Sequence, residues 1–172
     1  MRVGVYLLIW LLLFWRPVLA GAQSDGRKTA APAPSAGITT SELEQQFFDI
    51  LRDGDALQFL SYVPEDGVNI GRDALHATRN TVEEQLTNRK GLYCKLFDTA
   101  CLQASAPGKG CSYRELLTQS EKVRTASTET TRNSVRQAIL VAQVRNQKCG
   151  GALLIDFIFN HHQGGWKLFS IP

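Results

Sequence analysis

The chain has 172 residues, with 44% hydrophobic and 20% charged side chains and a formal net charge of +3. Removal of residues 1–22, which hold Arg2 and Arg16 and no acidic residue, leaves 17 basic side chains (19 minus 2) against 16 acidic ones. A charge this close to balance gives no long-range attraction to polyanions, and no basic cluster stands out in the sequence. We therefore expect neither nucleic acid nor a membrane surface as a partner.

The first 22 residues have the pattern of a cleavable signal peptide. A basic start is followed by thirteen uncharged residues, 3–15, and the small residues Ala20–Ala22 place the cleavage site after Ala22. Thirteen residues are fewer than the roughly 20 that a membrane-spanning helix needs, and Arg16 and Pro17 end the run. We expect an exported protein, periplasmic or secreted, without an integral membrane segment after cleavage; an uncleaved membrane anchor is the alternative.

The next segment, residues 23–40, is rich in Ala, Pro, Ser and Gly and has one large apolar side chain, Ile38. Such a segment buries too little surface to offset the entropy of ordering it, so we expect a flexible leader. The remaining residues, 41–172, have the length of one ordinary domain.

The mature chain has four cysteines, Cys94, Cys101, Cys111 and Cys149. In an oxidising compartment an even number of thiols predicts two disulfides, and four cysteines permit three connectivities, among which sequence alone does not choose. We favour a local Cys94–Cys101 bridge with a long-range Cys111–Cys149 bridge. A structural zinc site does not fit, because its ligand pairs are usually two to four residues apart.

Two helices are predicted at the start of the domain. Ser41 and Glu44 match the capping box that begins a helix, and apolar residues follow at helical spacing. A second short helix is expected over residues 55–62, with Leu57 and Leu60 pointing inward, because a proline follows soon after.

The middle of the chain alternates short elements. Glycines frame a short strand at residues 67–71. Thr81 opens a second capping box and a helix that Gly91 can end, and the same chemistry opens a helix over residues 112–117. We leave the strand order open between Leu92 and Cys111.

From residue 121 onward the pattern is that of strands. Four segments with apolar, β-branched or Ser/Thr-rich character are separated by turns, two of which have paired glycines; they are residues 121–131, 134–146, 152–160 and 166–171. Paired glycines suit tight hairpins, so we predict an antiparallel meander.

Alternation separates the two faces of this meander. One face of the third strand is wholly apolar and should meet the helices; it consists of Leu153, Ile155, Phe157 and Phe159. The opposite face also has apolar residues, Leu154 and Ile158, beside Asp156. A sheet that is apolar on both sides needs cover on both sides, which favours a homodimer formed through the sheet.

This order of elements, closing with residues 165–171 (GWKLFSI), resembles the NTF2-like superfamily, which includes ketosteroid isomerase and the SnoaL-type cyclases. The resemblance implies an α+β fold in which a curved antiparallel sheet wraps N-terminal helices, with a pocket between them and frequent dimers through the sheet. Members range from enzymes to scaffolds, so the resemblance assigns no activity.

Few side chains that could bind a ligand or take part in catalysis lie in a sequence context that suggests either role. Tyr93, Tyr113, Asp156 and Trp166 are our candidates for a pocket or its rim, although aromatic residues at such positions usually belong to the core. Parity places Asp156 opposite the apolar inner face, which argues against an acid in the pocket. The adjacent histidines at 161 and 162 fit a solvated turn. We assign no catalytic, cofactor-binding or metal-binding residue.

Three functions follow from this pattern. We favour an exported, non-catalytic binding domain for a small apolar ligand or a protein partner. The alternatives are an enzyme of the isomerase, dehydratase or cyclase type with a pocket in the cone, and a secreted inhibitor or immunity-like protein.

Overall fold

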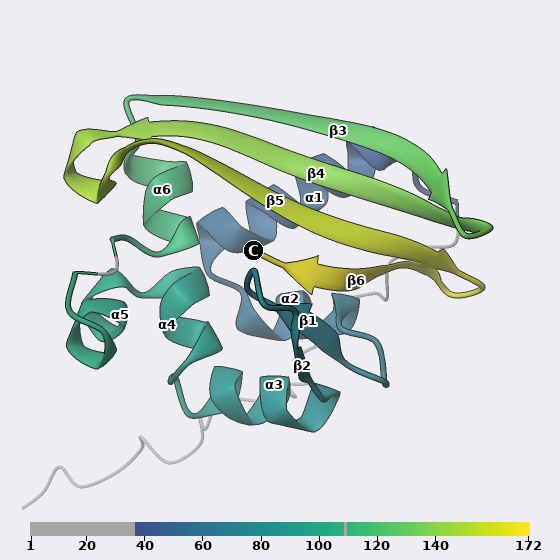
Figure 1. Cartoon of the computed structure of the whole chain (residues 1–172), viewed down its shortest axis with the longest axis horizontal. Helices are drawn as coiled ribbons and strands as arrows, with labels where there is room; N and C mark the ends of the chain where they lie inside the picture. Colours follow the sequence, from purple (N-terminus) through teal and green to yellow (C-terminus); the bar gives the residue numbers. More distant parts are fainter. Residues whose placement is uncertain (1–36, 109) are drawn as a thin grey trace, which may run out of the picture. The chain divides into compact units, whose positions relative to one another are not determined.

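The computed structural model describes residues 37–108 and 110–172 of the chain (Figure 1). The expected signal peptide, residues 1–22, and most of the expected leader, residues 23–36, lie outside the described residues. The elements in chain order are α1 (Thr40–Asp53), α2 (Ala56–Tyr62), β1 (Val68–Ile70), β2 (Leu75–Ala77), α3 (Arg79–Thr87), α4 (Leu92–Phe97), α5 (Thr99–Ser105), α6 (Tyr113–Gln119), β3 (Lys122–Arg132), β4 (Val135–Asn146), β5 (Gly151–His162) and β6 (Gly165–Ile171).

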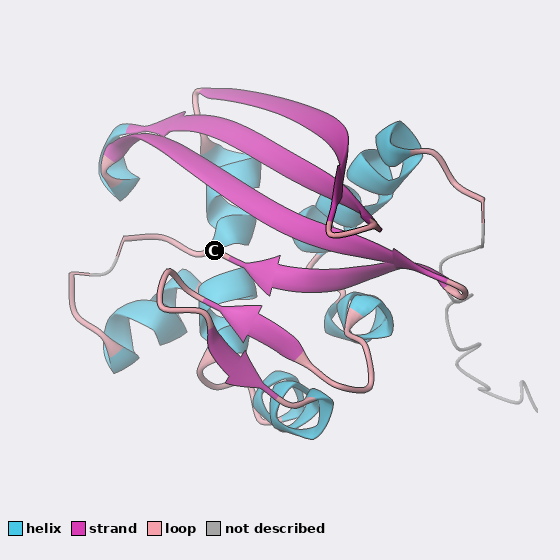
Figure 2. Cartoon of the chain, turned by 45° about the vertical axis from the view of Figure 1, so that its right-hand side comes forward, coloured by secondary structure: helices cyan, strands magenta, loops and turns pink. Residues whose placement is uncertain are grey.

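The strands form one mixed, six-stranded sheet in the order β2-β1-β6-β5-β4-β3. Strands β3 to β6 are the predicted antiparallel meander, and β1 adds to β6 in parallel. Figures 1 and 2 show the long strands arching over α1 and α6, so that one side of the sheet, here called the inner face, packs on helices. The predicted α+β, disulfide-linked fold is confirmed.

The predicted parity of the meander is also correct. On β5, Ile155, Phe157 and Phe159 are 3%, 0% and 0% exposed, whereas Leu154 on the opposite side, here called the outer face, is 62% exposed. The same alternation runs along β4, where Leu140 is fully buried. Because the period of a strand is two, one correct assignment fixes the direction of each of its side chains.

Helix α1 begins two residues earlier than predicted. Its N-cap is Thr39, whose hydroxyl accepts from the amide of Glu42 at 3.2 Å, while the Glu42 carboxylate accepts from the Thr39 amide at 2.7 Å. The expected cap, Ser41, lies inside the helix. A tertiary contact holds this start in place, since the indole N–H of Trp166 donates to the carbonyl of Ile38 at 3.2 Å.

Two further expectations about the helices were wrong. Leu57 is 67% exposed rather than inward, because α2 turns Phe59 and Leu60 toward the core. The N-cap of α3 is Thr78, not Thr81. The earlier start of α3 is due to β2, a strand that was not predicted. Strand β2 pairs with β1 up to Ala77, so α3 starts directly after this strand.

The described residues of the cysteine-rich segment 92–111 form α4, α5 and a loop and add no strand to the sheet, which answers the question of strand order left open there. Its two disulfides have the favoured connectivity. Cys94–Cys101 joins α4 to α5 with a Cα–Cα distance of 5.1 Å. Cys111–Cys149 joins the residue before the cap of α6 to the short turn after β4, with a Cα–Cα distance of 5.4 Å. Within the described residues, no helix is long and apolar enough to cross a membrane.

Candidate functional site

Aromatic side chains occupy the space between the helices and the inner face. The ring of Phe47, from α1, lies 4.9 Å from the rings of both Phe157 and Phe159 and 5.6 Å from that of Tyr62. All four residues are at most 3% exposed. Their mutual edge contacts, with interplanar angles of 69° to 84°, are those favoured by aromatic quadrupoles. The region in which a cone pocket was expected is thus filled by the protein's own core.

Two of the four pocket candidates belong to this core. Tyr113 is 9% exposed, and its hydroxyl donates to the backbone oxygen of Pro172 at 2.6 Å. Burial raises the pKa of Tyr113, with a smaller contribution from the negative charge of Asp156, so its hydroxyl stays protonated. Trp166 is 1% exposed and uses its N–H on Ile38. Both side chains have structural partners already.

The candidate Tyr93 is half-buried and lines a polar cavity of about 470 Å³ beside α4, α5 and α6. Polar groups of this cavity serve the fold. The Asp98 carboxylate caps α5 by accepting from the Cys101 amide at 3.0 Å. Thr99 and Ser112 hydrogen-bond to each other, through the Ser112 amide at 2.8 Å and through their hydroxyls at 3.1 Å.

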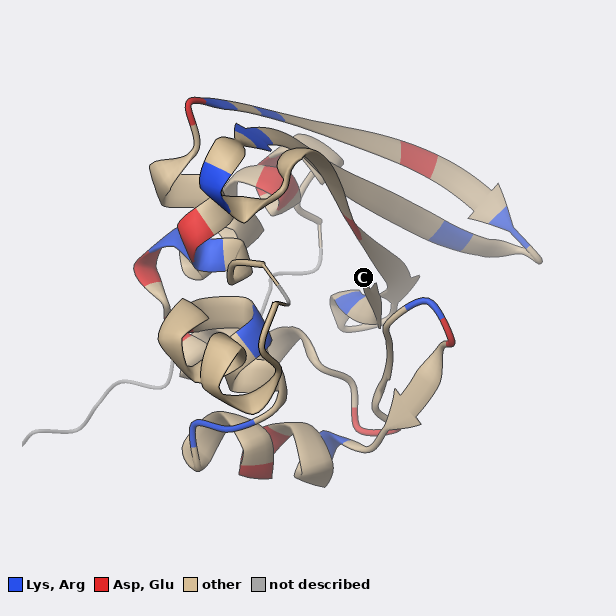
Figure 3. Ribbon diagram, turned by 60° about the vertical axis from the view of Figure 1, so that its left-hand side comes forward, with Lys and Arg blue, Asp and Glu red and all other residues tan. Residues whose placement is uncertain are grey.

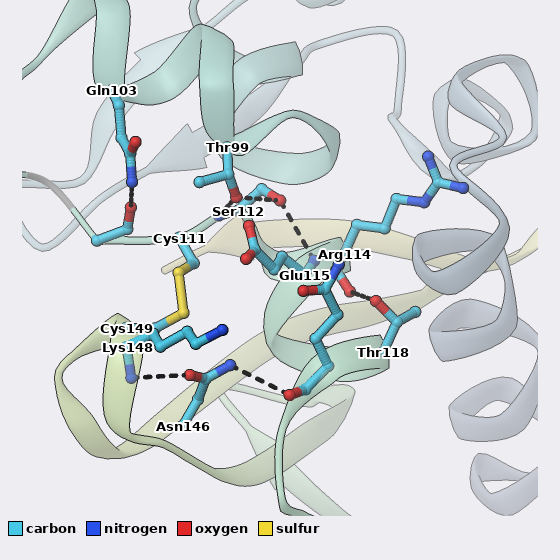
Figure 4. The surroundings of a disulfide bond; sticks show 12 residues. Thr99, Gln103, Cys111, Ser112, Arg114, Glu115, Thr118, Asn146, Lys148 and Cys149 are labelled. Atoms are coloured by element: carbon cyan, nitrogen blue, oxygen red, sulfur yellow. Dashed lines mark hydrogen bonds between the residues drawn. A yellow bond between two sulfur atoms is a disulfide. The ribbon is translucent and has the colours of Figure 1, made fainter.

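One group of side chains next to this cavity has the donor atoms of a metal site. The ligand atoms of Cys111, Glu115 and Cys149 lie within 4.8 Å of one another. However, the two sulfur atoms form a disulfide and offer no thiolate, as Figure 4 shows. A single carboxylate remains, which is too few ligands for a protein metal site.

A more apolar cavity of about 480 Å³ lies between the β1–β2 hairpin and helices α3 and α4. Leu75, which is 70% exposed, and Leu92 lie on its wall with the amide of Gln85. His76 also lines it, and its Nε2 atom is 2.7 Å from the carbonyl oxygen of Asp66. The residues that line this cavity come from β1, β2, α3, α4 and the loops beside them, and none of them belongs to β4 or β5.

The fourth candidate, Asp156, is on the outer face, as its parity predicts. It is exposed, pairs with Val141 on β4, and lies between Leu154 and Ile158 along β5. This part of the outer face therefore has apolar side chains, exposed Leu154 and half-buried Val141 and Ile158, around one carboxylate. Phe169, the residue inserted at the β5–β6 bulge, extends this surface at 42% exposure.

The histidines at the end of β5 form part of the predicted hairpin. His162 is exposed and pairs with Gly165, and the ring of His161 lies 4.9 Å from that of Trp166. The Arg136 guanidinium is 5.5 Å from the same indole and pairs with Glu129 at 2.7 Å. The Arg136 hydrogen bond lowers the pKa of Glu129. These contacts brace the hairpin end of the sheet.

The sequence analysis missed a basic corner on the outer face. Lys122 pairs directly with Arg145 across β3 and β4, and Arg124 follows two residues along β3, opposite Gln143. All three basic side chains are exposed, and within the described part of the chain none of them has an ion pair. We call Lys122, Arg124 and Arg145 the basic corner.

A count of charge by segment shows that basic residues predominate in the strand-forming part of the chain. Residues 37–121 have 8 basic and 13 acidic side chains, a balance of −5, whereas residues 122–172 have 7 basic and 2 acidic ones, a balance of +5. The overall charge conceals this separation. Figure 3 shows most acidic positions on the helices and their loops, where basic positions also occur, whereas the charged positions of the long strands are mainly basic.

The chain was compared with known proteins. No protein-family model matches it. No curated protein matches it either. Among solved structures, it is similar to a substituted variant of Rd1NTF2_05, with 9% identity, coverage of 76% of this chain and 92% of the other, and a TM-score of 0.42. It is also similar to Rd1NTF2_04 with long sheet, with 9% identity, coverage of 77% and 97%, and a TM-score of 0.41.

A third similar structure is that of an NTF2-like protein from Cytophaga hutchinsonii, with 10% identity, coverage of 76% of this chain and 89% of the other, and a TM-score of 0.39. Identities and TM-scores this low identify no ligand, partner or reaction.

Proposed function

We propose that this chain is an exported, non-catalytic domain that binds a protein partner through its surface. The observation that carries the proposal is the aromatic filling of the inner face, where Phe47 contacts Phe157 and Phe159. Small-molecule sites are concave and largely preformed. The contacts of Phe47 with Phe157 and Phe159 leave no space for such a ligand among these three rings.

Export is supported by the disulfides and by the signal-like pattern of residues 1–22. Stable disulfides form in oxidising compartments and are rare where thiols are kept reduced. A native product that retained residues 1–22 and four alkylatable thiols would contradict this part of the proposal.

The positions of the titratable side chains also favour binding over catalysis. General acid–base catalysis requires a side chain within hydrogen-bond reach of the substrate proton that it transfers. Asp156 is on the outer face, His161 is at the hairpin end of the sheet, and His76 is beside the β1–β2 hairpin. The inhibitor or immunity-like alternative is compatible with this proposal, because such proteins also act by binding another protein.

A small apolar probe tests the filled inner face. In crystals of the chain lacking residues 1–22 that are soaked with benzene, no benzene should lie between α1 and β5; the apolar cavity beside β1 and β2 is outside this test. Phe47→Ala should bind benzene, because removing this ring opens an apolar cavity. Leu57→Ala, at an exposed position, is the matched control and should not bind. If Phe47→Ala does not fold, Phe47→Leu replaces it. Uptake of benzene by the unsubstituted protein between α1 and β5 would overturn the proposal.

A further inference from the structure

We infer that the outer face of the sheet is the docking surface for an acidic protein partner. Carboxylates of the partner would contact the basic corner, and its apolar side chains would cover the adjacent surface formed by Val141, Leu154, Ile158 and Phe169, here called the apolar strip. This inference rests on the proposed function, because it identifies the surface through which the domain binds a protein.

The first support is the arrangement of the basic corner. Lys122 and Arg145 are directly opposite on neighbouring antiparallel strands, where Cβ atoms are about 4.5–5.5 Å apart. Arg124 is a diagonal neighbour of Arg145, on the same face. Like charges at directly opposite positions destabilise a sheet. Three unpaired cations at one corner therefore oppose folding, and an acidic partner would remove that repulsion on binding.

The second support is that the apolar strip adjoins this corner. Gln143, opposite Arg124, pairs on its other side with Leu154. From Leu154 the strip continues along β5 to Ile158, which pairs with Ser170 beside the inserted Phe169. Leu154 and Phe169 are 62% and 42% exposed. An exposed apolar surface beside charged residues is the usual composition of a protein-binding site.

The third support is charge complementarity, which favours an acidic protein over a second copy. In a face-to-face homodimer, each copy would bring the three cations of the basic corner and one carboxylate, that of Asp156, to the interface. Potentials of opposite sign are needed for favourable association, so such a dimer is disfavoured. Asp156 argues against a lipid surface, because its exposed carboxylate is at the centre of the apolar strip and would be pressed against the acyl region. A protein partner can place a donor there.

The test uses a helical peptide with leucines on one face and glutamates flanking them. Two versions, one with glutamine for each glutamate and one with serine for each leucine, serve as matched probes. The chain lacking residues 1–22 should bind the first peptide, and binding should weaken as salt is raised. The two other peptides should bind about tenfold more weakly or not at all, because each lacks one half of the complementary surface.

Variants locate the binding surface. Replacing Lys122, Arg124 and Arg145 together with glutamine should weaken binding of the acidic peptide about tenfold, since it removes the attraction of the corner. Leu154→Ser should weaken it similarly. The matched control replaces three exposed basic residues of the helical side, Arg72, Arg89 and Lys90, with glutamine. It makes the same change in net charge and should leave the affinity within twofold.

Several outcomes would overturn the inference. Equal affinity for the glutamate and glutamine peptides would show that acidic side chains of the partner are not recognised. A chain that sediments as a dimer disrupted by Leu154→Ser would assign the face to a second copy. Binding to phosphatidylserine vesicles with the same dependence on Leu154 would assign it to a lipid surface. If these tests fail while benzene is still excluded from the inner face, only the docking surface is wrong; if benzene enters, the proposed function itself fails.

Discussion

Removing each disulfide in turn should produce unequal losses of stability. The Cys111–Cys149 bridge spans 38 residues of sequence and the Cys94–Cys101 bridge spans 7. A cross-link stabilises mainly by restricting the denatured chain, and the loop-entropy relation gives about 4 kcal/mol for the longer loop and about 2 kcal/mol for the shorter one. The same relation gives a difference of about 1.5 kcal/mol, so we expect replacement of Cys111 and Cys149 by alanine to cost about that much more than replacement of Cys94 and Cys101.

Urea unfolding followed by tryptophan fluorescence measures these losses directly. Trp166 is the only tryptophan outside residues 1–22, and it is 1% exposed, so its emission reports the core. Loss of the longer bridge should also increase the denaturant dependence, because a longer stretch of unfolded chain becomes accessible. Equal losses, or a larger loss for the Cys94–Cys101 pair, would refute the reasoning. Both losses together approach the whole stability of a typical domain, which is about 5–15 kcal/mol.

Three further results are expected in the same assay. Thr39→Ala should cost about 1 kcal/mol through the lost cap, whereas Ser41→Ala should cost far less. Hydrogen bonds from the Thr39 amide and hydroxyl lower the pKa of Glu42 below its ordinary 4.5, and Thr39→Ala removes only the hydroxyl bond, at 2.9 Å. The part of the penalty that comes from this bond should be full above pH 4.5 and should decrease as the pH falls through the folded-state pKa; comparing the two proteins at several pH values checks this. Phe47→Ala should cost about 3–5 kcal/mol. Arg145→Gln should stabilise the free domain by about 0.2–1 kcal/mol, and destabilisation would contradict the repulsion inferred at the basic corner.

The sequence predicted those parts of the fold that depend on local period. Alternation along residues 152–160 placed Phe157 and Asp156 on opposite faces correctly, because the period of a strand leaves only one register once one face is buried. The hairpin at residues 161–165 followed from its paired glycines. Both signals act over a few residues, within reach of a single sequence.

Tertiary contacts decided what local pattern left ambiguous. Thr39-x-x-Glu42 and Ser41-x-x-Glu44 both match a capping box, and the first is used where the Trp166 indole binds the Ile38 carbonyl. This contact spans 128 residues of sequence. Similarly, Thr78 rather than Thr81 caps α3, because β2 ends just before it.

The candidate site depended still more on the fold. Lys122 and Arg145 are distant in sequence and become neighbours only through the pairing of β3 with β4. The sequence does show one property of this surface, because residues 122–172 are mainly basic and residues 37–121 mainly acidic. The filling of the expected pocket could not be predicted from the sequence, because it depends on the contacts of Phe47 with two rings of β5.

Diffraction from a crystal of the chain under xenon pressure tests the central claim most directly. Xenon enters apolar cavities that are empty and of sufficient size. The aromatic core predicts no xenon site among Phe47, Phe157 and Phe159, which are fully buried and in ring contact. An ordered xenon atom among these three rings would show that the inner face holds a ligand cavity, and it would contradict the proposal that this domain acts through its surface.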